Sequence, residues 1–222
     1  MIPKIIHYCW YGGADLPEDF KRFIDNWIKL NPDYQLIRWD ESNSPLDIPY
    51  LKRALNNKKW ANASNFVRLW AVYNHGGIYM DTDIDLKKSL DTLLDNDAFF
   101  GFQIDDAKAN NSFNNAFFGA QKGNVFVKKC YNALLALYDG LETAHLSSPH
   151  LTTFMLQQEG EFEYGLTEIN GIRLYPKEYF YPYSWEEKFE ESCVKPETIG
   201  VHFWDGSWSK KEPVKKRRWF NR

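Results

Sequence analysis

Residues 74–85 read NHGGIYMDTDID, and this stretch decides how the rest of the chain is interpreted. Two adjacent glycines indicate a turn, the apolar residues from Ile78 to Met80 predict a short buried strand, and carboxylates follow at once. Residues i and i+2 of a strand point to the same side, so we expect Asp81 and Asp83 to face one way. Two carboxylates that converge at a strand end repel each other unless a cation lies between them.

The paired carboxylates indicate a site for a divalent cation. Oxygen ligands of this kind suit Mg²⁺ or Mn²⁺. An ion held by few carboxylates completes its shell with water and with phosphate oxygens of a substrate. The motif therefore favours a metal–diphosphate site. An Asp-x-Asp tripeptide is common, however, and can also open a solvated turn; the glycines, the strand and the helix in front favour the metal site.

An amphipathic helix is predicted directly before this strand, over residues 60–74. Its apolar residues recur at spacings of three and four, and Gly76 lies where a C-terminal cap is expected. Asn65 and Arg68 are three positions apart, which places them side by side on another face. Arg68 can hold a hydroxyl or a phosphate, or can be a surface cation. Its place on the helix that leads into the Asp-x-Asp strand favours the first role.

The N-terminal part of the chain has the pattern strand, helix, strand. Residues 2–10 predict a buried strand, residues 20–28 an amphipathic helix and residues 34–39 a second strand. Such a βαβ unit favours a parallel sheet in an α/β fold.

Further elements follow the Asp-x-Asp motif. We predict a helical turn over 89–94, strands over 98–102, 115–120 and 199–204, a helix over 127–138, a helix start at Ser148-Pro149, a loop over 105–115 and irregular packed structure over 171–185. There is no internal repeat and no interdomain linker. We therefore expect a single domain over residues 1–209, followed by a basic aromatic tail over 210–222.

Composition limits the class of protein. A chain of 222 residues with 44% apolar residues can bury a sizeable core as one domain. No run of eighteen apolar residues exists, so no membrane span is expected, and the first residues lack the apolar segment of a signal peptide. Three cysteines without metal-ligand spacing predict free thiols in a reducing compartment.

The charge is unevenly distributed. Residues 210–222 carry a net charge of +6, whereas the whole chain carries −3. With Trp219 and Phe220, this tail could rest on an anionic membrane surface, or it could be a solvated segment that keeps the protein soluble. Nucleic-acid binding is not expected, because the rest of the chain is acidic.

Four stretches resemble one family: IHYCWYGG at 6–13, ANASNFVR at 61–68, GGIYMDTD at 76–83 and HFWDGSW at 202–208. In this order they are similar to the DxD-motif glycosyltransferases of the family 32 type. That family includes yeast initiating α-1,6-mannosyltransferases, bacterial capsule and lipopolysaccharide sugar transferases, and the catalytic domain of large clostridial glucosylating toxins. The resemblance implies a GT-A fold, in which a Rossmann-like, mainly parallel sheet flanked by helices binds a nucleotide-sugar at the C-terminal ends of its strands.

The resemblance also implies roles by position. Catalysis would depend on Asp81, Asp83 and Arg68. The metal, Mn²⁺ or Mg²⁺, would be held by Asp81, Asp83, His202 and Ser207. The donor would be contacted by Trp10, Tyr11, Ser64, Asn65, Arg68, Tyr79, Asp81, Asn115, Ser207 and Trp208, with Trp10 on the nucleotide base and Trp208 over the diphosphate.

Asn65 departs from the family pattern, because many members carry Asp at this position. An amide still donates and accepts hydrogen bonds. It lacks a charge-assisted bond to Arg68, and such bonds are roughly twice as strong as neutral ones. Two outcomes stay open, a donor that differs from the usual one or a weakened activity.

We therefore expect a metal-dependent, retaining glycosyltransferase that moves a hexose from a UDP- or GDP-sugar to an oligosaccharide or lipid-linked oligosaccharide, in bacterial capsule, lipopolysaccharide or exopolysaccharide synthesis. The enzyme would be cytoplasmic, or peripheral on the inner face of the cell membrane through residues 210–222, and would not bind nucleic acid. Two alternatives remain. One is a nucleotide-sugar-binding protein with little transferase activity, motivated by Asn65, and the other is a metal-dependent phosphohydrolase.

Overall fold

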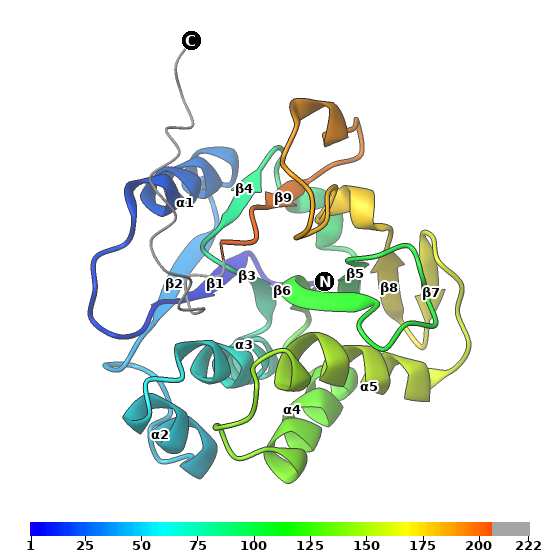
Figure 1. The fold of residues 1–222 in the computed structure, drawn as a ribbon. Coiled ribbons are helices and arrows are strands. Elements are labelled where there is room, and N and C mark those ends of the chain that lie inside the picture. Colours follow the sequence, from blue (N-terminus) through cyan, green and yellow to red (C-terminus); the bar gives the residue numbers. More distant parts are fainter. Residues whose placement is uncertain (206–222) are drawn as a thin grey trace.

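The structure is a computed structural model that describes residues 1–205 (Figure 1). In chain order its elements are β1 (Ile5–Cys9), α1 (Glu18–Leu30), β2 (Gln35–Trp39), α2 (Pro49–Asn56), α3 (Trp60–His75), β3 (Gly77–Met80), β4 (Ile84–Leu86), η1 (Asp91–Leu93), β5 (Ala98–Phe102), β6 (Phe113–Ala120), α4 (Val125–Leu137), η2 (Leu146–His150), α5 (Leu151–Glu159), β7 (Thr167–Ile169), β8 (Ile172–Tyr175), η3 (Lys177–Tyr179), η4 (Glu191–Cys193) and β9 (Gly200–His202). The predictions made for Ser207, Trp208 and the 210–222 tail lie outside the described residues and stay predictions.

Within residues 1–205, seven strands form one sheet in the order β2-β1-β3-β6-β5-β8-β7, and β4 pairs with β9 in a second, small sheet. Strands β1, β2, β3, β5 and β8 run in one direction, whereas β6 and β7 run against them. The predicted N-terminal βαβ unit is present, because β1 and β2 pair in parallel with Ile5 opposite Gln35. The predicted α/β class is confirmed, with a mixed sheet.

The large sheet separates two hydrophobic cores. Helices α2 to α5 cover one face, and α1 with the β4–β9 sheet lies on the other (Figure 1). Neighbouring residues of a strand enter opposite cores, as the pleat requires. Phe100 and Phe118 stack at 5.0 Å between ring centroids under the helices, whereas Phe99 and Phe117 pack on the α1 side. The sheet is therefore buried on both faces, which explains its apolar strands.

The strong amphipathic patterns gave correct helices. Helix α1 buries Phe20, Phe23, Ile24 and Trp27, as its spacing predicts, although Ile28 is exposed. Helix α3 follows the predicted range to within one residue. The three cysteines are free, as predicted. Among the described residues, no helix has both the length and the apolar character that crossing a bilayer requires.

Several short elements differ from the prediction. Helix α2 and strands β4, β7 and β8 were not expected, and β6 begins two residues before the predicted strand. Ser148 and Pro149 do not start a helix. They lie inside the π-helix η2, which begins two residues earlier, at Leu146, and in which the His150 N–H donates to the His145 carbonyl at 3.2 Å. This π-helix leads directly into α5.

A glycine turn joins α3 to β3. Gly76 (φ +69°) caps α3 with an N–H that donates to the carbonyl of Val72 at 2.8 Å. Gly77 has φ +108°, and a Cβ there would lie 2.6 Å from the Ile5 carbonyl oxygen. Only glycine fits this combination of left-handed backbone and close approach. The turn brings β3 beside β1 in parallel and directs its C-terminal end to the same edge of the sheet as the end of β1.

Candidate active site

The Asp-x-Asp segment connects the two sheets. Strand β3 ends at Met80, and the Asp81 N–H still donates to the Ala116 carbonyl of β6 at 2.8 Å. The chain then turns, with the Ile84 N–H donating to the Asp81 carbonyl at 3.2 Å, and Ile84 pairs with His202 across β4 and β9. The expectation that Asp81 and Asp83 share one side of a continuous strand is therefore wrong. They lie in a turn, because β4 leaves the large sheet to pair with β9.

Asp81 is held from the large sheet and from α3. Its Oδ1 accepts from the Tyr79 hydroxyl at 2.7 Å and from Arg68 Nη2 at 3.0 Å. Both donors use the same oxygen. The Asp81 side chain is 28% exposed, whereas that of Arg68 is 6% exposed. The carboxylate is thus fixed on its inner side and accessible on its outer side.

Asp83 is held from the small sheet. Its Oδ1 lies 3.2 Å from His202 Nε2, and its Oδ2 accepts from the Asp205 N–H at 2.8 Å. The Phe203 N–H donates to the Asp83 carbonyl at 3.0 Å. The segment that follows β9 therefore wraps around Asp83, which is why the last strand is needed to complete the site.

The structure brings Asp81, Asp83 and His202 together, as predicted for three of the metal ligands. One ligand atom from each of the three lies within 4.8 Å of the others, and no other group of this kind occurs in residues 1–205. His202 Nδ1 is buried and has no hydrogen-bond partner among the described residues. Two carboxylates and an imidazole form a donor set that suits Mn²⁺ and related ions. These residues fit a divalent cation.

The pKa values of Asp81, Asp83 and His202 are shifted because the three side chains are buried close together. Burial is the largest influence on Asp81 and raises its pKa; Arg68 opposes this and Asp83 adds to it, so the pKa lies above the ordinary value. Burial alone would also raise the pKa of Asp83, but His202 and the bond from the Asp205 N–H outweigh it and lower that pKa. Burial would lower the pKa of His202, but Asp83 raises it above the usual value. A bound cation would relieve the repulsion between the two carboxylates.

Arg68 lies under the site and is fully engaged with protein oxygens. Besides Asp81, it donates from Nη1 to the Asn115 carbonyl at 2.9 Å and to Asn115 Oδ1 at 3.2 Å, and from Nε to the Ser64 carbonyl at 3.2 Å. Its guanidinium stacks over the Tyr79 ring at 4.6 Å. Arg68 is therefore not a surface cation. Its bonds fix Asp81 and Asn115.

The side-chain NH₂ group of Asn115 is buried and makes no hydrogen bond to the described residues. Its side chain is fully buried, and Oδ1 accepts both from Arg68 and from the Ser148 hydroxyl. Its Nδ2 is buried without a partner among the described residues. Buried amide groups are nearly always paired in the folded protein, so this NH₂ group is a candidate contact for a bound ligand.

Asn65 makes no hydrogen bond to Arg68, unlike the carboxylate that the family pattern places at this position. Its Nδ2 donates to the Ala144 carbonyl at 2.8 Å and to Ser147 Oγ at 3.2 Å. The side chain is therefore directed to the segment that precedes α5. Its predicted contact with the donor stays a prediction.

The other predicted donor contacts have partners within the fold. Trp10 follows β1, donates from Nε1 to the Ala14 carbonyl at 2.6 Å and packs edge-on against Phe20. Tyr11 is buried, and its hydroxyl pairs with Ser44 at 2.9 Å. Their roles in donor binding stay predictions.

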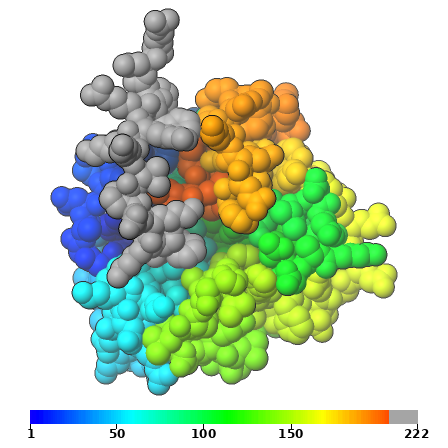
Figure 2. Space-filling view, viewed as in Figure 1, coloured from blue at the N-terminus to red at the C-terminus, as the bar shows by residue number. Residues whose placement is uncertain are grey.

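Two residues of the site were not predicted. Asp205 lies in the quoted HFWDGSW stretch but was given no role, and Ser148 was interpreted only as part of a helix start. The signal for Asp205 was its place two residues before Ser207 in that stretch. In Figure 2 the residues near 200, coloured orange-red, lie next to the orange segment.

Solved structures that are similar to this one include glycosyltransferases. The PaToxG glycosyltransferase has a TM-score of 0.59 at 22% identity and covers 71% of this chain and 70% of its own. The galactosyltransferase LgtC, solved with donor and acceptor sugar analogues, has a TM-score of 0.51 at 11% identity and covers 93% and 90%. At these identities the likeness shows the fold alone, and that fold is the GT-A fold.

Sequence comparison finds two glycosyltransferase family models that match successive parts of the chain. A model of a glycosyltransferase sugar-binding region containing a DXD motif matches residues 17–100, and a model of an α-1,4-glycosyltransferase conserved region matches residues 119–218. Both models describe glycosyltransferases and the first includes the DXD motif, so the chain resembles the DxD-motif glycosyltransferases along most of its length.

Curated relatives of the chain include named mannosyl- and galactosyltransferases. Inositol phosphoceramide mannosyltransferase 2 of Schizosaccharomyces pombe is 33% identical over 102 residues, which are 42% of this chain and 28% of that protein. Mannosyl phosphorylinositol ceramide synthase SUR1 of Saccharomyces cerevisiae is 31% identical and covers 45% and 27%. Lactosylceramide 4-alpha-galactosyltransferase of Rattus norvegicus is 29% identical and covers 71% and 42%. The chain spans less than half the length of each of these three relatives.

Proposed function

We propose that this protein transfers a hexose from a nucleoside diphosphate sugar to an acceptor hydroxyl, with retention of configuration and with a divalent cation held by Asp81, Asp83 and His202. The observation that supports this most strongly is the convergence of these three side chains within 4.8 Å at the end of β3. The edge beyond the C-terminal ends of the strands is where open α/β sheets bind their ligands.

The cation and the residues around it would have different roles in the reaction. The cation would supply Lewis-acid stabilisation of the leaving diphosphate. Arg68 and Tyr79 hold Asp81 in place, and His202 with the Asp205 N–H holds Asp83. Because these partners are already in position, little reorganisation is needed when negative charge develops. No side chain is assigned as nucleophile or general base.

The acceptor we propose is a sugar or inositol hydroxyl on a lipid headgroup. The named relatives include enzymes of inositol phosphoceramide and of lactosylceramide, both of which are lipid-borne acceptors. These names favour a glycolipid acceptor over the bacterial capsule and lipopolysaccharide acceptors expected from the sequence. The cytoplasmic or peripheral location and the contact of residues 210–222 with an anionic membrane remain part of the proposal, and so does the choice between a UDP- and a GDP-sugar.

The two alternatives receive no support from the described residues. The binding-protein alternative depended on the loss of a carboxylate beside Arg68, but Arg68 has Asp81 as its carboxylate partner and Asn65 faces elsewhere. The phosphohydrolase alternative would want further ligands for a second metal, and residues 1–205 contain one group of three.

The test is a transfer and hydrolysis screen. The native chain is incubated with UDP-glucose, UDP-galactose, UDP-N-acetylhexosamines or GDP-mannose, in Mn²⁺, Mg²⁺ or chelator, with glycolipid acceptors in micelles and with soluble oligosaccharides. We expect release of the nucleoside diphosphate from one donor, dependence on the metal and preference for the lipid acceptors. Release of phosphate from simple esters, or donor turnover unaffected by chelator, would contradict the proposal.

A further inference from the structure

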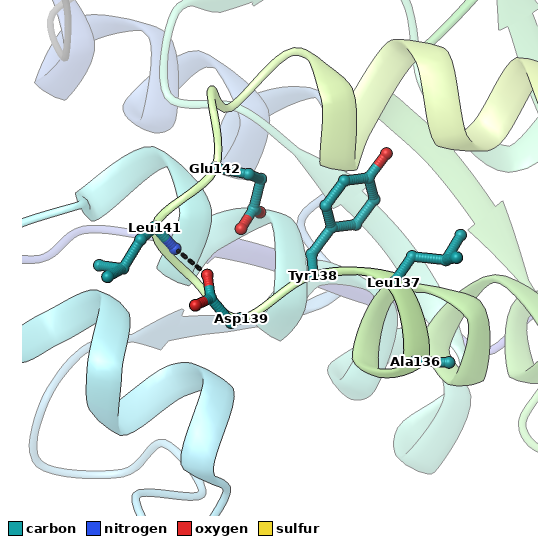
Figure 3. Close-up of a pocket in the computed structure, with 6 residues that line it drawn as sticks. All are labelled: Ala136, Leu137, Tyr138, Asp139, Leu141 and Glu142. Atoms are coloured by element: carbon teal, nitrogen blue, oxygen red, sulfur yellow. Dashed lines mark hydrogen bonds between the residues drawn. The ribbon is translucent and has the colours of Figure 1, made fainter.

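Residues 139–150, here called the strap, connect α4 to α5 and are tied to α2 and α3 by side chains. At its outer end, Asp139 accepts from Arg53 at 2.6 Å and Glu142 accepts from the Tyr50 hydroxyl at 2.5 Å. Gly140 fits here with φ +91°, since a Cβ would lie 2.6 Å from the Tyr50 carbonyl oxygen. This end borders a surface pocket of about 610 Å³, lined by residues 136–139, 141 and 142 (Figure 3).

Two asparagines of α3 bind the backbone of the strap in the same way. Asn62 Nδ2 donates to the Glu142 carbonyl at 2.9 Å, and Asn65 Nδ2 donates to the Ala144 carbonyl at 2.8 Å. Both side chains are nearly fully buried, at 2% and 3% exposed. The two bonds are chemically equivalent but reach different points of the strap, one near the pocket and one near the site.

The orientation of the Asn65 amide follows from its partners. A backbone carbonyl only accepts hydrogen bonds, so the nitrogen and not Oδ1 must face Ala144. The Ser147 hydroxyl itself donates to the Ala144 carbonyl at 3.4 Å, which leaves its oxygen free to accept from Asn65 at 3.2 Å. Asn65 therefore acts as a double donor to residues 144–147.

The strap contacts the site through Ser148, the residue that follows Ser147. The Ser148 hydroxyl donates to Asn115 Oδ1, the oxygen that also accepts from Arg68 Nη1. These two donors together determine which way the Asn115 carboxamide points and leave its buried Nδ2 without a partner within residues 1–205. Ser147 is fully buried and Ser148 is 7% exposed, so the connection is shielded from water.

We propose that Asn65 is a positioning residue of the donor site and not a donor ligand: it anchors the strap so that Ser148 and Arg68 hold Asn115 with its NH₂ group presented to the bound nucleotide-sugar. This inference rests on the proposed function. It also gives a physical reason for the departure from the family pattern. A carboxylate at position 65 would face the Ala144 carbonyl oxygen without a proton to donate, so this strap requires an amide.

The experiment compares donor binding by four variants, with Asn62→Ala as the matched control. Isothermal titration with UDP- and GDP-hexoses in Mn²⁺ is carried out on the native chain and on Asn65→Ala, Asn65→Asp, Ser148→Ala and Asn62→Ala. Far-ultraviolet circular dichroism checks that each is folded. We expect the two Asn65 variants and Ser148→Ala to bind the donor about tenfold more weakly, as for one lost hydrogen bond, and Asn62→Ala to remain within about twofold of the native chain.

A double variant and hydrogen exchange separate positioning from general loss of structure. If Asn65 acts through Ser148, Asn65→Ala/Ser148→Ala binds the donor about as weakly as either single variant, because the effects are not additive. Amide exchange without ligand should rise at 144–148 in Asn65→Ala and near 142 in Asn62→Ala. Additive losses, equal losses in the Asn62 and Asn65 variants, or tighter binding by Asn65→Asp would each overturn the inference. A native chain that binds none of these donors would contradict the proposed function itself.

Discussion

Arg68 of α3 and Asp81 at the end of β3 form an ion pair, with the buried guanidinium Nη2 3.0 Å from Oδ1 of the partly exposed carboxylate. The same guanidinium reaches Asn115 of β6, so one side chain connects a helix and two neighbouring strands at the edge of the sheet. Through this arrangement the fold determines where one of the two carboxylates of the Asp-x-Asp motif lies.

Replacing Arg68 with lysine tests whether the forked geometry is needed. Lysine keeps the charge but cannot donate to Asp81, Asn115 and Ser64 at once. We expect the free energy of unfolding to fall by about 2–3 kcal/mol, because buried acceptors lose charged donors, and donor affinity to fall with it. Urea unfolding and donor titration measure the two effects. Arg53→Lys, at an exposed ion pair, is the control and should change stability by less than about 1 kcal/mol. Equal effects of the two substitutions would contradict this role of Arg68.

Asp83→Asn tests the metal site directly in turnover. The amide keeps the shape of the side chain but removes a charged ligand. Since a Lewis-acid cation contributes several kcal/mol to the transition state, we expect at least about a hundredfold loss of metal-dependent turnover. Asp85→Asn is the matched control, because Asp85 is two residues away and pairs with Lys87 at 2.9 Å. Turnover that survives in Asp83→Asn would show that this carboxylate has no part in the reaction.

Tyr79→Phe removes one of the two donors to Asp81. The ring would keep its place over Arg68, but the hydroxyl bond of 2.7 Å would be lost. We expect a loss of about 1 kcal/mol in unfolding free energy and a several-fold weaker affinity for Mn²⁺, measured by titration. Tyr34→Phe removes a hydroxyl bond to the exposed Asp91 and should leave Mn²⁺ affinity unchanged. If both variants bind Mn²⁺ as the native chain does, Tyr79 does not orient the ligand.

The α3–β3 turn should tolerate no side chain at Gly77. Gly77→Ala combines a left-handed backbone with a Cβ placed 2.6 Å from the Ile5 carbonyl oxygen. Gly123→Ala is the matched control, because Gly123 also has positive φ (+77°) but no atom within 4 Å of such a Cβ. The control should lose about 1–2 kcal/mol of stability, and Gly77→Ala at least twice as much. Similar losses in denaturant unfolding would mean that the turn can shift.

His7 should make the fold sensitive to acid. Trp39 Nε1 donates to His7 Nδ1 at 3.1 Å, so Nε2 carries the proton and donates to the Gly76 carbonyl at 2.8 Å. Burial lowers the pKa of His7 from 6.5 to about 4. The unfolded chain therefore binds a proton before the folded chain does. The stability from neutral His7 is complete above pH 6.5 and is lost as the pH falls towards 4.

The size of this effect is about 3 kcal/mol, because one pKa unit corresponds to about 1.4 kcal/mol. Urea unfolding of the native chain and of His7→Gln between pH 4 and 7.5 measures it. The difference between the two chains should be largest above pH 6.5 and shrink as the pH falls. A difference that does not change with pH would contradict a neutral, buried His7.

The sequence predicted the parts of the fold that have strong local patterns. Helices α1 and α3 have apolar stripes at helical spacing, and Gly76 lies at the expected cap position. Strands β1, β2, β5 and β9 lie within the predicted strand ranges. Helix α2 has eight residues, too few for its spacing to stand out. Strands β4 and β7 have three residues each and exist only because β9 and β8 pair with them.

The site was predictable in its residues but not in its connections. Asp81, Asp83 and His202 came from the motifs and meet in the structure. The partner of Asn65 could not be predicted, because Ala144 is 79 positions away and lies in an irregular segment with no periodic pattern. The family pattern suggested Arg68 instead. Contacts made by loops depend on the packing of the helices around them, and no local rule encodes that packing.

The most direct measurement is a crystal structure of the protein grown with Mn²⁺ and UDP or GDP, recorded at a wavelength that gives an anomalous signal from manganese. We expect one anomalous peak in contact with Asp81, Asp83 and His202, with the diphosphate oxygens completing its coordination. A peak elsewhere, or a nucleotide bound without manganese at these three residues, would contradict the proposal that this edge of the sheet holds the metal and the sugar donor.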